Sequence, residues 1–215
     1  MQTPVWDGSM SVFPAAITLA ESGFDLGNLL DQPGYADGGP NVHSLSLVTW
    51  LTAAVIALVG DSPALFPVLH VIHFAIAAAT MAGLLRFAQA VLGAWLGAAA
   101  SLTVLLFPLV LTQAGYLYLE FPMLGVAVFA ALAWSRGNLP MSISWSAAAV
   151  LIKGSGIIVP MALAGMAFFD PRPGHRKARS GLLILIVPTI ILAISVSFIP
   201  GLVNEANIRD HLVIM

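Results

Sequence analysis

Long apolar stretches separated by short polar turns dominate the chain from residue 64 to residue 200. These stretches do not alternate apolar and polar positions, as a membrane β-barrel would, so the pattern predicts helices. We expect about six membrane helices, with the last one broken or kinked at Pro188. They cover residues 64–88, 90–112, 118–134, 142–153, 155–168 and 181–200.

The apolar segment 142–168 is cut in half by the sequence Lys153-Gly154-Ser155-Gly156. Each half has about a dozen residues and would span roughly 20 Å as a helix. The hydrocarbon core of a bilayer is about 30 Å thick, so neither half would cross it comfortably. We therefore predict two short helices that meet at the glycines.

Residues 1–43 are polar and rich in turns, and we predict that residues 1–63 form an outer loop. The apolar piece 11–20 is too short to cross a bilayer and is predicted to be an interfacial helix. Residues 44–60, about 17 in number, are at the lower limit for a span. An interfacial or re-entrant helix is preferred there, and a crossing helix is the alternative. Residues 201–215 are expected to form an outer tail.

The composition supports a membrane protein. Hydrophobic residues make up 59% of the chain and charged residues 8%, and the mean hydropathy is +0.96. Soluble domains carry about a quarter charged residues, so the expected fold class is all-α, a polytopic transmembrane bundle. The sequence has no basic stripe that would indicate nucleic acid. It also has no cysteine, which excludes disulfides and thiolate catalysis.

The distribution of charge predicts a topology. If 44–60 does not cross, six of the eight basic residues fall on one side and nine of the ten acids on the other. The positive-inside rule makes the basic side cytoplasmic, so the opening loop, Glu120 and Lys153 would face outward. If 44–60 crosses, the basic residues stay inside only when the acidic opening is inside too. The six basic residues are Arg86, Arg136, Arg172, Arg176, Lys177 and Arg179, and Asp170 is the exceptional acid.

Glu120 and Lys153 are the only carboxylate and the only ammonium within the mostly apolar stretch 112–160. An ionisable group at membrane depth is costly and is a functional candidate by default. The structural alternatives are that Glu120 caps the helix beginning beside it and that Lys153 snorkels to the surface. His70 and His73 share a helical face, but no third metal ligand lies near them in sequence. We therefore predict interhelical hydrogen bonds for these two histidines and no metal site.

Four features resemble a known family. They are Asp7 in an outer loop near an amphipathic helix, LVGDSP at 58–63, YLEFPMLG at 118–125, and AVLIKGSGIIVP at 149–160. Together they resemble the C-type (GT-C) glycosyltransferases that use polyprenyl-phosphate-linked sugars. Lipid A aminoarabinose transferases and protein O-mannosyltransferases are the members most similar in these features. The resemblance covers roughly residues 5–168.

The resemblance implies an enzyme on the outer face of a bacterial cytoplasmic membrane. An acceptor hydroxyl on a lipid, glycan or protein would attack C1 of a polyprenyl-phosphate sugar, and lipid phosphate would leave. By analogy, Asp7 is the general base. Glu120 is hypothesised to position the acceptor or the base, or to bind a divalent cation such as Mg²⁺ or Mn²⁺. Lys153 is hypothesised to pair with the donor phosphate.

Other site residues follow from the same resemblance. The backbone amides at Gly154 and Gly156 are expected to help bind the donor phosphate. His43 and Tyr118 are candidate substrate contacts.

The sequence also departs from the family pattern. Asp7 is followed by Gly8 where the family has an Asp-Glu pair, and Glu120 stands where an Asp is usual. Family members begin with a membrane helix before the first loop and continue for several more helices, so we expect this chain to be a fragment. The alternatives are a transporter or flippase fragment with a broken-helix site at 153–156, or a non-catalytic membrane subunit. In a transporter the break would lie near the middle of the membrane. In the transferase it would lie near the outer face, beside the loop that carries Asp7.

Overall fold

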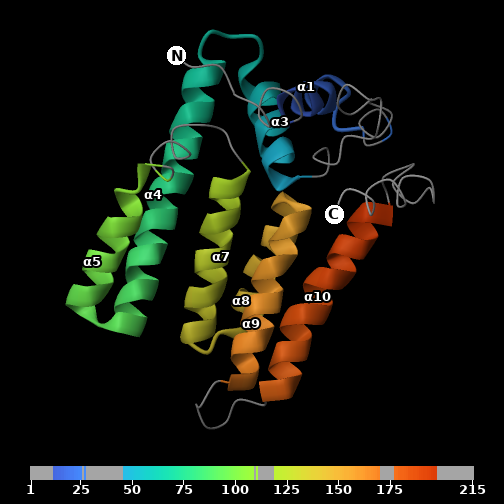
Figure 1. The fold of residues 1–215 in the computed structure, drawn as a ribbon. Coiled ribbons are helices and arrows are strands. Elements are labelled where there is room, and N and C mark those ends of the chain that lie inside the picture. The colour runs from blue at the N-terminus through green and yellow to red at the C-terminus, as the bar shows by residue number, and fades with distance from the viewer. Residues whose placement is uncertain are drawn as a thin grey trace, which may run out of the picture.

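The computed structural model describes residues 12–25, 27, 46–108, 110, 119–169 and 177–197. Within these ranges every regular element is a helix, which confirms the all-α class. Six helices form an elongated bundle, and two further helices lie at one end of it (Figure 1). Asp7, His43 and Tyr118 lie outside the described residues.

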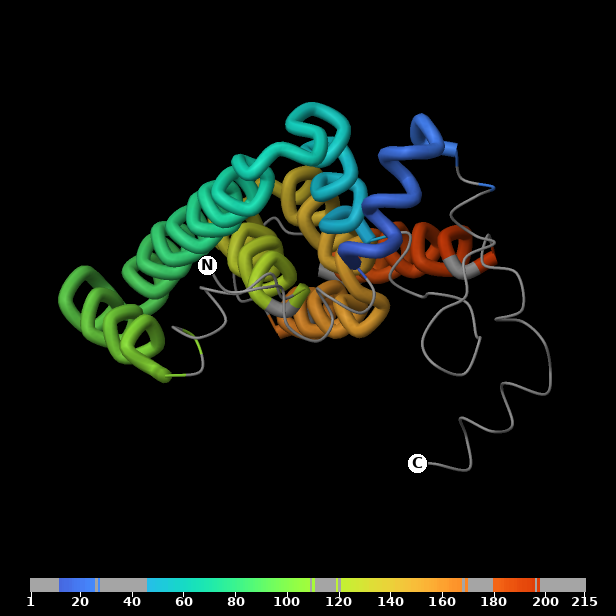
Figure 2. The backbone as a smooth tube through the Cα atoms, turned by 90° about the horizontal axis from the view of Figure 1, so that it is seen from above, coloured from blue at the N-terminus to red at the C-terminus, as the bar shows by residue number. Residues whose placement is uncertain are grey.

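Helices α4 (Leu65–Leu92) and α5 (Ala94–Leu105) form an antiparallel pair at one edge of the bundle (Figures 1 and 2). The turn between them is Gly93, whose φ of 85° is in the left-handed region that favours glycine. The predicted boundary near residue 89 is therefore wrong, because α4 continues to Leu92. A Cβ on Gly97 would collide with the backbone of Gln89, so the two helices touch almost backbone to backbone.

Helix α7 (Glu120–Ser135) runs parallel to α4. The rings of His73 and Phe121 lie 6.4 Å apart between centroids. Further along both helices, a Cβ on Gly125 would collide with the side chain of Thr80. Because both contacts advance in the same direction along the chain, the two helices point the same way. Because α4 and α7 are parallel, α5 runs in the opposite direction and returns the chain towards the end where α7 begins.

Helix α8 (Leu139–Ile152) runs back along α7. Its start is capped by Asn138, whose side-chain oxygen accepts a hydrogen bond from the Met141 amide at 3.1 Å. The buried Ser142 hydroxyl then donates to the Ala130 carbonyl at 3.0 Å, which joins α8 to α7. The chain leaves the α-helical conformation at Lys153.

After Lys153, a short 3₁₀ helix, η2 (Gly154–Ile157), leads into α9 (Ile158–Phe169). Leu163 and Ala167 of α9 pack with Trp134 and Ile184 near the other end of the bundle. Helices α8 and α9 therefore form a helical hairpin with Lys153 at its tip. The predicted interruption at Lys153–Gly156 is confirmed.

Helix α10 (Lys177–Ser197) covers both arms of this hairpin. It contains Pro188 and continues through it without a break in the helix assignment. The sequence predicted a break or a kink here: the helix is not broken, and the proline side chain is fully buried. A kink at Pro188 stays a prediction.

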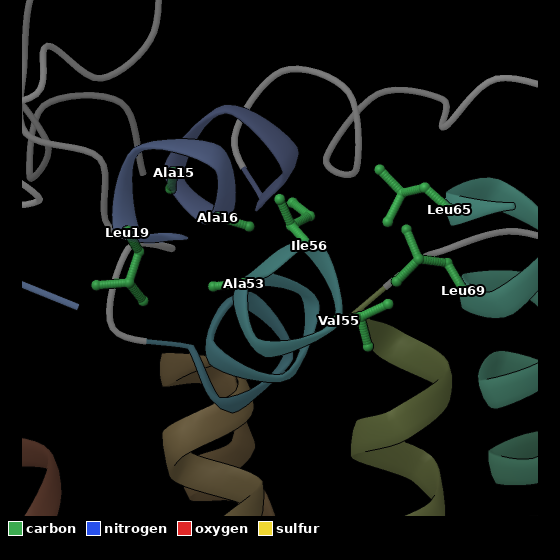
Figure 3. Close-up of a cluster of buried hydrophobic side chains, with 8 residues drawn as sticks. All are labelled: Ala15, Ala16, Leu19, Ala53, Val55, Ile56, Leu65 and Leu69. Carbon is green, nitrogen blue, oxygen red and sulfur yellow. The ribbon is translucent and has the colours of Figure 1, made fainter. Parts of the chain in front are cut away.

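Helices α1 (Phe13–Glu21) and α3 (Leu47–Val59) pack against each other at the end of the bundle where α4 begins. Figure 3 shows α1 lying on α3 through small side chains, with Ala16 opposite Ala53. On its other side α3 places Val55 and Ile56 towards Leu69 and Leu65 of α4. With 13 residues, α3 spans about 20 Å, so it is shorter than a bilayer core.

Among the described residues, only α4, with 28 residues, has both the length and the hydropathy of a membrane-crossing helix. Six spans, as expected from the sequence, are therefore not established by the fold. The arms of the hairpin are short: α8 has 14 residues and α9 has 12. At 1.5 Å per residue they extend about 21 Å and 18 Å.

Candidate functional site

The two ends of the bundle differ in charge. At one end, here termed the Lys153 end, α4 and α7 begin and α8 turns into α9. The acids Glu21 and Asp61 also lie at this end, at the ends of α1 and α3. The opposite end, termed the Arg136 end, carries Arg136 after α7 and Arg86 in the last turns of α4. Apart from Lys153 itself, the acids named here lie at one end of the bundle and the arginines at the other.

The two glycines at the tip of the α8–α9 hairpin differ in how closely other atoms surround them. Lys153 is extended, with φ −153° and ψ 137°, and its amide donates to the Ala149 carbonyl at 3.2 Å. The amide of Gly156 donates back to the Lys153 carbonyl at 2.7 Å. Gly156 is buried, and a Cβ there would collide with the Ala149 carbonyl oxygen, whereas a Cβ on Gly154 would meet nothing within 4 Å.

This geometry suits an anion. The Lys153 side chain is half-buried, while Gly154 and Ser155 are exposed. The first N–H groups of a helical turn have no acceptor within that turn, and they favour a negatively charged ligand. Lys153 is therefore followed directly by two exposed residues at the start of η2.

Ser46 connects this tip to the helices packed on it. The buried Ser46 hydroxyl donates to the carbonyl of Ile152, the last residue of α8, at 2.8 Å. The same oxygen accepts from the Val48 amide at 3.2 Å and caps α3. A serine before an apolar run signals a helix cap in the sequence, but nothing in the sequence pairs it with Ile152.

A small apolar cluster brings the neighbours of the predicted site residues together. Val12, Leu119 and Ile152 are buried in it, with Val48 packed against them. Leu119 precedes Glu120, and Ile152 precedes Lys153, so the backbones at both ionisable positions lie at the same end. Glu120 is the first residue of α7, although its side chain lies outside what the structure describes.

His73 was not assigned to this site by sequence analysis. Its side chain is only 4% exposed, and its ring faces that of Phe121, the residue after Glu120. Its neighbour His70 instead has Nδ1 at 2.8 Å from the Phe66 carbonyl, one turn earlier in the same helix. The prediction of an interhelical bond is therefore wrong for His70. A histidine in an apolar helix was the available signal, but the sequence did not indicate which helix it faces.

The described residues do not assemble a metal centre. No group of three or more His, Asp or Glu side chains gathers in the part of the chain that the structure describes. The i, i+3 pair formed by His70 and His73 accordingly has no third ligand there.

Searches of protein-family models, of curated proteins and of solved structures find no match to this chain. These comparisons therefore establish no family for the chain.

Proposed function

We propose that this protein is a membrane glycosyltransferase that moves a sugar from a polyprenyl-phosphate donor to an acceptor hydroxyl at the Lys153 end. One observation carries the proposal: the break in the α8–α9 hairpin lies at the same end of the bundle as the first turn of α7. The backbone positions that carry the Lys153 cation and the Glu120 carboxylate are therefore neighbours in the fold.

The chemistry of transfer needs these two kinds of group. The acceptor oxygen attacks C1 of the sugar, and the bond from C1 to the phosphate oxygen breaks with its electron pair leaving on the phosphate. The hydroxyl proton passes to a carboxylate acting as general base. A cation and backbone amides stabilise the charge that develops on the departing phosphate.

In this proposal Asp7 is the base, and Lys153 binds the phosphate with the amide of the exposed Gly154. The predicted role of Gly156 is dropped, because this glycine is buried and its amide donates to the Lys153 carbonyl at 2.7 Å. Glu120 positions the acceptor or the base, or binds a divalent cation. His43 and Tyr118 contact the substrates.

The surface of the bundle supports a location in a bilayer. Trp95 of α5 is 90% exposed, and Val71 and Phe74 of α4 are 67% and 56% exposed. Large exposed apolar patches mark surfaces that contact lipid or another protein. With Arg86 and Arg136 at one end, the positive-inside rule directs the Arg136 end to the cytoplasm and the Lys153 end outward.

All six bundle helices are proposed to lie in the membrane. Helix α10, with 21 residues, extends about 31 Å and matches the core. The other four, with 12 to 16 residues, would require a thinned bilayer or flanking residues that extend to the interface.

The position of the break favours a transferase over a transporter. Transporters place the gap between two half-helices near the middle of the membrane, with one half continuing beyond the other. Here the chain turns back at Lys153 instead of continuing in the same direction. Leu163 and Ala167 of α9 accordingly pack with Trp134 of α7, far from the tip. A hairpin tip that lies beside the first turn of α7 suits a substrate that approaches from one face.

Binding of the lipid phosphate tests the site directly. The full chain is reconstituted in liposomes, and its affinity for undecaprenyl phosphate is measured for wild type, Lys153→Ala and Lys153→Arg. A charge-assisted hydrogen bond contributes about 1.5–3 kcal/mol, so Lys153→Ala should weaken binding roughly 10- to 100-fold. Lys153→Arg should keep most of the affinity.

Arg136→Ala is the matched control, because it removes a cation from the opposite end of the bundle. It should leave the affinity unchanged. Equal affinities for Lys153→Ala and Arg136→Ala would contradict the assignment of the phosphate site and favour a lysine that only reaches the interface.

Turnover tests the acids separately. In the same liposomes, Asp7→Asn and Glu120→Gln should lower transfer from a polyprenyl-phosphate sugar while undecaprenyl phosphate still binds. Wild-type turnover in both variants would remove these two acids from the mechanism. Phosphate binding with no transfer to any acceptor would instead favour the non-catalytic subunit.

A further inference from the structure

A second concave site lies at the Lys153 end, at the junction of α1, α3 and α4. It is an open groove of about 640 Å³. Its walls come from the length of α1, the last turn of α3 and the turn that leads into α4. The hairpin tip does not contribute to its lining, so the groove is separate from the proposed donor site.

The floor of the groove is apolar. Phe13 of α1 and Phe66 of α4 stack on each other with ring centroids 5.5 Å apart and an interplanar angle of 19°. Ile17 and Ile56 complete this surface between the two helices. Beneath it lies the tightly packed cluster of α1, α3 and α4 shown in Figure 3. A hydrocarbon chain placed here would exchange water for aromatic and branched side chains.

The rim of the groove is acidic. Glu21 ends α1 and Asp61 follows the Gly60 that ends α3, and both carboxylates are exposed. Among the described residues that line the groove none is Lys, Arg or His, and the sequence contains no Lys or Arg before Arg86. Two like charges with no basic residue among them favour a cation and repel an anion.

We propose that this groove binds a cationic amphiphile, a molecule with an apolar chain and an ammonium head. The chain lies on Phe13, Phe66 and Ile56, and the head sits between Glu21 and Asp61. The two ends of such a molecule match the two parts of the groove, whereas an anionic amphiphile matches only the floor. The proposal does not depend on glycosyl transfer, because none of these residues belongs to the donor site.

Direct binding of labelled detergents at low concentration tests this proposal. The full chain is placed in nanodiscs of zwitterionic lipid, and radiolabelled decyltrimethylammonium is titrated against decyl sulfate, which has the same chain length. Saturable binding should favour the cation about tenfold or more, and the preference should fall as salt screens the carboxylates. Equal binding of the two detergents, or uptake of the cation that never saturates, would contradict the proposal.

Two variants and a control locate the site. Glu21→Gln combined with Asp61→Asn should remove the preference for the cation, and Ala57→Trp should fill the groove and lower binding of both detergents. Asp25→Asn is the control, because Asp25 is an exposed acid at the same end that does not line the groove. If the double variant binds the cation as tightly as Asp25→Asn does, the groove is not the site. Loss of this binding while undecaprenyl phosphate still binds would show that the two sites are independent.

Discussion

The hydroxyl of Ser46 donates a hydrogen bond to the carbonyl of Ile152, a residue 106 positions later in the chain, at 2.8 Å. The last carbonyls of a helix have no partner in their own ladder, so this bond satisfies an acceptor that would otherwise be buried without one. The same oxygen caps α3 by accepting from Val48. One hydroxyl therefore holds the helices that cover the Lys153 end against the hairpin tip.

Removal of this hydroxyl should destabilise the fold more than removal of an ordinary serine. Ser46→Ala leaves the buried Ile152 carbonyl unsatisfied and α3 uncapped, so we expect a loss of about 1–3 kcal/mol in the free energy of unfolding. Ser46→Thr should retain most of the stability. Ser144→Ala is the control, because its exposed hydroxyl bonds only within α8, to the Pro140 carbonyl. Thermal unfolding in detergent measures the difference, and equal melting temperatures for the two alanine variants would disprove the special role.

The two glycines of the hairpin tip should respond differently to alanine. At Gly156 the added methyl group collides with the Ala149 carbonyl oxygen, which is backbone and cannot rotate away. Overpacking of this kind costs about 1–3 kcal/mol. At Gly154 the methyl group meets open space, so Gly154→Ala should unfold near the wild-type temperature. If both variants melt alike, the chain does not turn back at Gly156 as described.

The parallel contact between α4 and α7 predicts a rescue. Gly125→Ala should destabilise the bundle because its methyl group overlaps the Thr80 hydroxyl oxygen, while the Thr80 Cβ is 3.6 Å away. Thr80→Ala removes that oxygen, so the double variant should recover most of the loss. The coupling energy in a double-mutant cycle should be about 0.5–3 kcal/mol. Additive effects of the two substitutions, measured by thermal unfolding, would show that these positions are not in contact.

The sequence predicted the elements whose boundaries carry polar or glycine signals. Lys153-Gly154-Ser155-Gly156 interrupts an apolar stretch, and the structure turns back there. The corner at Gly93 was placed wrongly, because the residues on both sides are apolar and a single left-handed glycine makes the turn. A one-residue corner leaves no polar loop in the sequence by which it could be recognised.

The candidate site could be predicted only in part, for a physical reason. Alternating helix directions assign each loop to one end of a bundle, so the common end of Glu120 and Lys153 follows from counting helices. Contacts between helices do not follow from counting. The bond from Ser46 to Ile152 and the burial of His73 against Phe121 depend on how the faces of distant helices pack. Sequence periodicity indicates which face is apolar, but not which neighbour covers it.

The absence of cysteine from the chain allows the proposed orientation to be tested residue by residue. Ser155→Cys and Ser62→Cys each place one exposed thiol at the Lys153 end, in η2 and in the turn before α4. Arg136→Cys places one at the opposite end, after α7.

If the positive-inside rule orients the bundle, a membrane-impermeant maleimide applied to intact cells should label the first two variants. It should label Arg136→Cys only after the membrane is permeabilised. Labelling of Ser155→Cys and Arg136→Cys from the same side would mean that the bundle does not span the membrane. Labelling of Arg136→Cys alone would mean that it is inserted in the opposite direction. In that second case the phosphate-binding tip would face the cytoplasm, and the donor would have to be supplied from that side.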